Sequence, residues 1–151
     1  NGVSITSTGD ADQDLDVTST TAGNVSIVAL VGSHDYVVRD TTGQVTIATA
    51  GGHNETMVIL DTEADVSIAS TGNATQDLNV THTGGGVTID SDSGAHDIVV
   101  KDTFRDVVIR TLESNPDTVD VFIYNCDNLD VSTSDGIDTI EIDQARGNQT
   151  I

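Results

Sequence analysis

The sequence predicts an all-β protein, a two-sheet parallel β-solenoid of stacked β-arches with about seven rungs of 20–22 residues. Three observations predict this fold. The segment from Val3 to Thr18 returns from Val66 to Thr81 with 12 of 16 positions identical, which marks an internal repeat. A Val-x-Ile motif also recurs every 20–22 residues. Ser, Thr, Asp, Asn and β-branched residues dominate without any 3.6-residue apolar stripe, which argues against helices.

The first strand of each repeat is a short alternating segment whose apolar residues are expected to face the interior. The apolar pairs are Val3/Ile5, Val25/Ile27, Val45/Ile47, Val66/Ile68, Val87/Ile89, Val107/Ile109 and Leu129/Val131. The residue between each pair is mostly a hydroxyl residue and is expected to face water. These residues are Ser4, Ser26, Thr46, Ser67, Thr88, Val108 and Asp130.

The second strand of each repeat follows a polar bend rich in Gly, Asp and Asn. It begins about 12 residues after the first Val and again alternates with period two, so it is also predicted to be a β-strand. The expected inward pairs are Leu15/Val17, Tyr36/Val38, Met57/Ile59, Leu78/Val80, Ile98/Val100, Val119/Val121 and Ile140/Ile142.

The repeats fill the whole chain, so residues 1–151 are expected to form a single domain. Its rungs should start near residues 1, 23, 43, 64, 85, 105 and 127, with a partial rung at 147–151. An antiparallel sandwich is the alternative fold. It would not require equivalent residues of successive repeats to match, whereas stacked parallel arches place them in columns about 4.8 Å apart.

The composition limits what the protein can bind. Its net charge is −20, from 25 acidic and 5 basic residues, so a basic surface for nucleic acid or anionic membrane is not expected. No apolar segment is long enough to predict a membrane span. The chain has no Trp and only four other aromatic residues, which predicts a thin aliphatic core.

Two features suit an extracellular protein. Five asparagines begin Asn-X-Ser/Thr glycosylation triplets: Asn24, Asn54, Asn73, Asn79 and Asn148. The single cysteine, Cys126, cannot form an internal disulfide, so it is either a free thiol or half of a bridge between subunits.

The segment Gly9-Asp-Ala-Asp-Gln-Asp contains the candidate metal ligands, Asp10, Asp12 and Asp14. Alternating carboxylates are hard oxygen ligands suited to Ca²⁺. The equivalent positions of the fourth repeat are Asn73, Thr75 and Asp77, so the run can also be a solvated acidic turn. Ca²⁺ is the only metal considered, and no other cofactor is expected.

No constellation of residues predicts catalysis. His34 and His96 occupy equivalent sites 62 residues apart, about 14 Å along the stack, while His53 lies in a bend and His82 on a strand. A column before the second strands reads Asp14, Asp35, Thr56, Asp77, Asp97, Thr118 and Thr139 and is interpreted as structural. Thr-x-Thr ladders of the kind that bind ice are interrupted at Asp40 and Asp102. The protein is therefore not expected to be an enzyme.

The repeated arches with Val-Ser-Ile and Gln-Asp-Leu motifs, the acidic composition, the glycosylation triplets and the lone Cys126 resemble the amyloid-like sheath proteins of methanogenic archaea. This resemblance implies a stack of β-arches that assembles edge to edge into an extracellular sheath. It also implies that Cys126 cross-links subunits.

The chain opens with the strand motif and closes on it again, without a helical or irregular cap, so both ends should expose strand edges. The expected assembly edges are Val3, Ile5, Leu129, Val131 and Ile151. The sequence thus favours a self-assembling structural subunit of a filament, sheath or cell-surface layer, whose partner is another copy of the chain. The alternative is a secreted acidic binding module for Ca²⁺ or glycans, similar to an adhesin stalk.

Overall fold

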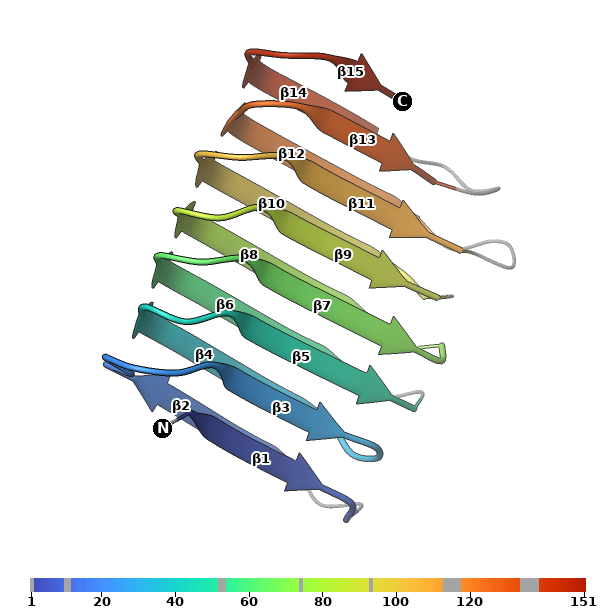
Figure 1. Cartoon of the computed structure of the whole chain (residues 1–151). Coiled ribbons are helices and arrows are strands. Elements are labelled where there is room, and N and C mark those ends of the chain that lie inside the picture. Colours follow the sequence, from blue (N-terminus) through green and yellow to red (C-terminus); the bar gives the residue numbers. More distant parts are fainter. Residues whose placement is uncertain are drawn as a thin grey trace.

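The computed structural model describes residues 2–9, 12–51, 54–73, 75–92, 94–112, 118–133 and 139–151, and it confirms the all-β solenoid (Figure 1). The described residues form fifteen strands. They are β1 (Val3–Ser7), β2 (Gln13–Thr18), β3 (Val25–Ala29), β4 (His34–Thr41), β5 (Val45–Ala50), β6 (Glu55–Thr62), β7 (Val66–Thr71), β8 (Gln76–Thr83), β9 (Val87–Ser91), β10 (His96–Thr103), β11 (Val107–Thr111), β12 (Val119–Cys126), β13 (Leu129–Ser132), β14 (Thr139–Ala145) and β15 (Gln149–Thr150).

The strands form two parallel sheets. Sheet A contains the odd-numbered strands in the order β1 to β15, and sheet B contains the even-numbered strands in the order β2 to β14. Each strand therefore pairs with its equivalent in the neighbouring repeat, as the solenoid requires and a sandwich does not. No helix long and apolar enough to cross a membrane lies in the described part of the chain.

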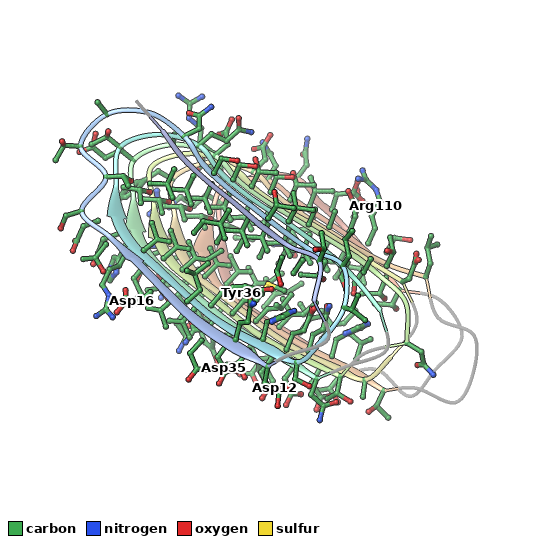
Figure 2. The ribbon with its side chains drawn as sticks, turned by 90° about the horizontal axis from the view of Figure 1, so that it is seen from below. Asp12, Asp16, Asp35, Tyr36 and Arg110 are labelled. Atoms are coloured by element: carbon green, nitrogen blue, oxygen red, sulfur yellow. The ribbon has the colours of Figure 1, made fainter. Side chains whose placement is uncertain are left out.

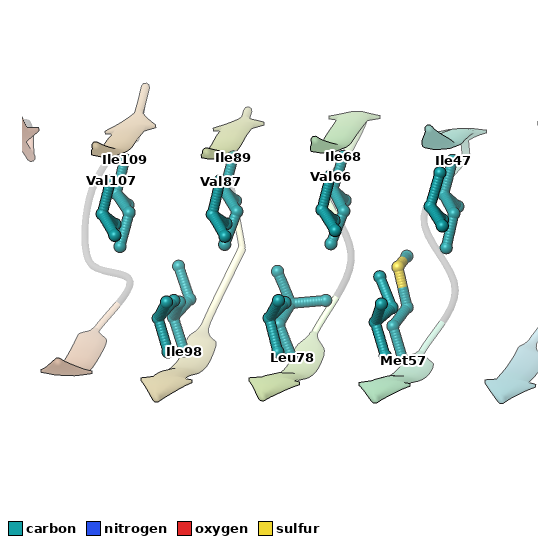
Figure 3. Close-up of a cluster of buried hydrophobic side chains, with 14 of the residues drawn as sticks. Ile47, Met57, Val66, Ile68, Leu78, Val87, Ile89, Ile98, Val107 and Ile109 are labelled. Atoms are coloured by element: carbon teal, nitrogen blue, oxygen red, sulfur yellow. The ribbon is translucent and has the colours of Figure 1, made fainter. Parts of the chain in front are cut away.

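The register of sheet A matches the columns expected from the sequence. Val3 pairs with Val25 and Ile5 with Ile27, and the same pairing repeats as far as Leu129 and Val131. The aliphatic side chains of the two sheets point toward each other and form one thin core, as predicted (Figure 3). Ile47, Ile68 and Ile89 are each at most 1% exposed.

The expected register is wrong in one rung. Ile98 and Val100 pair with Val121 and Ile123, not with Val119 and Val121. The acidic column accordingly continues through Asp120 instead of Thr118. More residues separate β11 from β12 than separate β9 from β10, and the longer connection shifts the strand by two positions. A shift of two keeps each residue on its face, so alternation could not reveal it.

An unusual backbone conformation repeats near the end of each sheet B strand, inside the strand in every case except Ser19, which follows β2. One non-glycine residue per rung has a φ between 52° and 63°, in the left-handed region. These residues are Ser19, Asp40, Asp61, His82, Asp102, Asn125 and Gln144. Asp and Asn adopt this conformation more readily than most residues. In the inner rungs, the residue directly after each of these left-handed residues is buried. The change in backbone direction therefore closes the solenoid interior on this side.

Candidate functional site

The ends of the solenoid carry the strands that have a partner on one side only. β1 and β2 form one end, and β15 and β14 form the other (Figure 1). Most inward aliphatic residues of the outermost strands are only partly buried, Val17 of β2 being the exception, whereas their equivalents in the inner rungs are almost fully buried. These partly buried residues are Val3, Ile5, Leu15, Ile140 and Ile142.

The predicted assembly edge differs from the structure at two residues. Leu129 and Val131 are 2% and 1% exposed, because they lie in the core of the last complete sheet A strand, β13. β15 pairs with β13 through Leu129 and Asp130, so the outermost strands at this end are β15 and β14. Val3 and Ile5 do lie on an outermost strand, and Ile151 is 70% exposed.

The two sheets differ by one strand. Sheet A has eight strands and sheet B has seven, because β15 has no partner strand across the core in the described chain. β15 itself is only two residues long. Its segment is held to β13 by backbone hydrogen bonds, one from the amide of Leu129 to the carbonyl of Asn148 and one from Gly147 to Asp127, both 2.9 Å long.

The acidic column predicted before the second strands lies on the outer surface of sheet B. Asp16 and Asp35 point outward from this sheet, and Arg110 points outward from the opposite one (Figure 2). Arg39 bonds Asp16 of the neighbouring rung at 2.8 Å. A hydrogen bond from Thr18, together with this guanidinium, holds the pKa of Asp16 below its usual range. Basic residues thus bridge acidic ones along the stack.

The candidate calcium ligands do not converge among the described residues. Asp12 accepts a hydrogen bond of 3.3 Å from the amide of Ser33 in the next rung, while Asp14 lies exposed on β2. Asp10 lies outside the described residues. Within the described ranges, no three His, Cys, Asp or Glu side chains form a group suited to a metal ion. Calcium binding stays a prediction.

The histidines are not brought together. His34 and His96 are buried in one column, separated by Glu55 and Gln76 in the two rungs between them. His82 is exposed, with Asp61 and Asp102 at 3.6 and 3.4 Å from its two ring nitrogens. His53 lies outside the described residues.

The buried column that contains these histidines is a polar network that alternation did not predict. Gln76 donates to the carboxylate of Glu55 at 2.9 Å and to the hydroxyl of Ser70, and it accepts from Ser91 at 3.0 Å. Its side chain is fully buried. The network runs along the solenoid axis inside the core. The recurrence of a polar residue two positions before the second apolar pair in the first five repeats, Gln13, His34, Glu55, Gln76 and His96, was the available signal.

A second set of buried polar residues lies on the opposite side of the core. Thr41, Thr62, Thr83 and Thr103 form a column at the end of sheet B, and each is at most 2% exposed. Cys126 takes the same place in the next rung and is 1% exposed. Burial raises the pKa of its thiol, and the charges of Asp127 and Asp106 add to this effect. An intersubunit disulfide would require the last rung to open.

The five glycosylation asparagines all lie exposed: Asn24, Asn54, Asn73, Asn79 and Asn148. Their exposure is compatible with modification but does not test it. A shallow acidic hollow lies beside the exposed ring of Phe104, with Asp40, Asp61, Glu63 and His82 in its wall.

Comparison with protein-family models, with curated proteins and with solved structures finds no match for this chain.

Proposed function

We propose that the protein is a structural subunit, not an enzyme, that self-assembles end to end into an extracellular filament, sheath or cell-surface layer. One observation carries the proposal. The outermost strands at the two ends belong to the same columns of one repeating register, and both leave aliphatic side chains partly uncovered. Exposed, matching parallel edges pair with one another unless something prevents it.

The register of the inner rungs gives the expected junction in sheet B. β2 of an incoming copy pairs with β14, which places Leu15 on Ile140 and Val17 on Ile142 in the core. This junction repeats the contacts between neighbouring rungs within one molecule. Burial of a fully exposed aliphatic side chain contributes about 1.5–3 kcal/mol, and each of these partly buried residues contributes less than that when it is covered.

Sheet A requires an adjustment at the same junction. β15 adds one strand to sheet A only. Both sheets therefore continue without a gap only if β15 detaches from β13 and β1 of the incoming copy pairs with β13 in its place. Removing residues 147–151 is therefore expected to speed assembly, because β13 and β14 then present an even end.

The acidic residues at the junction should make assembly depend on salt. The pairing of β2 with β14 places Glu141 of one copy next to Asp16 of the other on the outer surface. Two neighbouring carboxylates repel, and added salt or Ca²⁺ screens them. Salt is thus expected to promote assembly, and Glu141→Gln should lower the salt concentration that is needed.

Light scattering and negative-stain microscopy of the purified 151-residue chain test the proposal. The chain should form filaments at high concentration with added salt. Ile142→Asp places a charge in the core side of the junction and should abolish them, whereas Ser67→Asp, on the outer face of a central rung, should not. Dispersed wild-type molecules, or filaments of the Ile142→Asp variant, would contradict it.

A secreted binding module is the second candidate, and the acidic hollow beside Phe104 favours it. Isothermal titration calorimetry with Ca²⁺ separates the two functions. Binding without any change in scattering supports the module, whereas scattering that rises with added Ca²⁺ supports assembly.

A further inference from the structure

The outer face of sheet B has an asymmetric pattern of charge that end-to-end assembly does not use. Its outward side chains form three columns, each running along the solenoid axis. The first column contains Asp14, Asp35, Thr56, Asp77, Asp97, Asp120 and Thr139. The central column contains Asp16, Val37, Val58, Asn79, Val99, Phe122 and Glu141, and the third contains Thr18, Arg39, Leu60, Thr81, Lys101, Tyr124 and Asp143.

In the five inner rungs, the charge of this face changes from the first column to the third. One side is acidic, the centre is mainly apolar, and the far side carries two of the five basic residues of the chain, Arg39 and Lys101. Each of these two shares its rung with an aspartate of the first column. Arg39 lies on β4 with Asp35, and Lys101 lies on β10 with Asp97. The central valines are partly exposed.

This arrangement is complementary to itself under one two-fold rotation. When the axis runs parallel to the solenoid between two facing copies, the first column of each copy faces the third column of the other in the same rung. Asp35 then faces the partner copy's Arg39, and Asp97 faces Lys101. The central column faces itself, so Val58 lies against its own equivalent, while Asp16 and Glu141 of the two terminal rungs face their own equivalents and oppose the contact there. A two-fold axis along the strands would instead place aspartate against aspartate.

We propose that the outer face of sheet B, in a chain without a glycan on Asn79, is a dimerisation surface for a second copy of this chain, with the two solenoids side by side and parallel. Opposite charges that face each other across an interface fix its orientation and register. Apolar and aromatic side chains at the centre, here Val37, Val58, Val99 and Phe122, supply the desolvated core of such an interface.

The two basic residues keep contacts within their own chain that position them for this role. Arg39 bonds Asp16 at 2.8 Å, and its side chain remains 41% exposed. The ammonium of Lys101 lies 5.3 Å from the ring centre of Tyr124 and is directed along the third column. Both groups therefore remain on the outer face, where an aspartate of the facing copy can reach them.

The outer face of sheet A lacks this complementarity. Arg110 lies between Asp90 and Asp130 of its own chain, at 3.5 and 3.6 Å. The outward residues of β3, β5 and β7 are uncharged, as at Thr46, Ala48 and Ser67. This face has no separated columns of opposite charge that would orient a partner, so it serves as the internal control.

The proposed interface is small. Five rungs spaced by about 4.8 Å, with strands about 22 Å long, bury on the order of 1,000 Å² over both copies, near the lower limit for a specific interface. The dimer should therefore be weak and its population should depend on concentration. The inference does not rest on end-to-end growth, because the two surfaces are on different parts of the molecule.

Sedimentation equilibrium of the unglycosylated chain, with and without Ile142→Asp to suppress end growth, tests the proposal. We expect a monomer–dimer equilibrium in the Ile142→Asp chain, and the same dimer together with larger species in the wild type. Val58→Asp places two carboxylates together on the symmetry axis and should weaken the dimer at least tenfold. Ala48→Asp, at the matching position of sheet A in the same rung, should leave it unchanged. Circular dichroism and thermal melting confirm that each variant is folded.

A charge exchange tests the orientation. Lys101→Asp alone should weaken the dimer, and adding Asp97→Lys in the same chain should restore it, because the two columns exchange roles under the two-fold axis. A wild-type chain that stays monomeric up to about 1 mM overturns the proposal. So does a dimer that Val58→Asp does not weaken, or that Ala48→Asp weakens equally. Filaments that persist in the Val58→Asp variant would show that end-to-end assembly does not require the side-by-side dimer.

Discussion

Tyr36 differs from the other members of its column because it carries a hydroxyl group into the aliphatic core. The equivalent residues in the neighbouring rungs are Leu15 and Met57. Tyr36 is 3% exposed, and its hydroxyl has no hydrogen-bond partner among the described residues. Burial raises the pKa of this phenol, and the nearby charge of Glu55 raises it further. The native state therefore holds the Tyr36 proton more tightly than the unfolded state does.

This difference predicts that the free energy of unfolding falls in alkaline solution. The contribution of Tyr36 is fully present below about pH 10, the ordinary pKa of tyrosine, and is lost as the pH rises above it, because only the unfolded state then releases the proton. Tyr36→Phe should make the decline shallower. Urea unfolding between pH 7 and pH 11 measures it.

Tyr124→Phe is the matched control, because Tyr124 lies on the outer face of sheet B, next to Lys101 on the neighbouring strand. This variant should keep the wild-type dependence on pH. If Tyr36→Phe and the wild type lose stability in parallel above pH 10, Tyr36 is not the group responsible.

At the scale of the strand, β8 depends on a polar residue in the core. Gln76 begins this strand and connects Glu55 of β6 with Ser70 and Ser91 of sheet A. All of these residues are buried. The network thus ties the two sheets together across three neighbouring rungs. A slip of one residue in β8 would turn Gln76 outward and break every one of these bonds.

Gln76→Leu should therefore destabilise the protein by about 2–4 kcal/mol, because buried oxygen atoms of Glu55 and Ser91 lose the partner they have in Gln76. Gln13→Leu is the control. Gln13 belongs to the same column but is exposed in the first rung, so its replacement should change stability by less than about 0.5 kcal/mol. Thermal melting compares the two. Equal losses would show that the network contributes nothing specific.

At the scale of the whole molecule, stability comes from contacts between neighbouring rungs. Each described strand pairs only with its equivalents in the rungs above and below it, so the two terminal rungs have one neighbour instead of two. Their core residues are also more exposed, as Leu15 and Ile140 show in comparison with Leu78 and Ile98. The ends should open more often than the centre.

Amide hydrogen exchange should therefore be slowest in β7 to β10 and fastest in β1, β2, β14 and β15. Mass spectrometry of the exchanged chain, at a concentration low enough to prevent association, measures this gradient. Assembly should then raise protection at the ends selectively. Uniform protection along the monomer would contradict the expected lower stability of the terminal rungs.

Much of this fold could be predicted from the sequence because each rung repeats the same requirements. Val25 and Ile27, with their equivalents, face the core in the expected columns of sheet A. Period-two alternation assigns each such side chain to a face, and repetition at a fixed spacing assigns each strand its neighbour. Both properties are visible in the sequence itself, so they could be predicted before the fold was known.

The remaining features depend on how the chain folds around them. The longer connection before β12 decided that Val121 and not Val119 takes the place next to Ile98. The pairing of β15 with β13 decided that Leu129 is buried and that β13 is not an outermost strand. The complementary columns on sheet B exist only once seven strands lie side by side. Connection length, edge pairing and the meeting of side chains from distant segments are tertiary properties, which alternation along the chain does not encode.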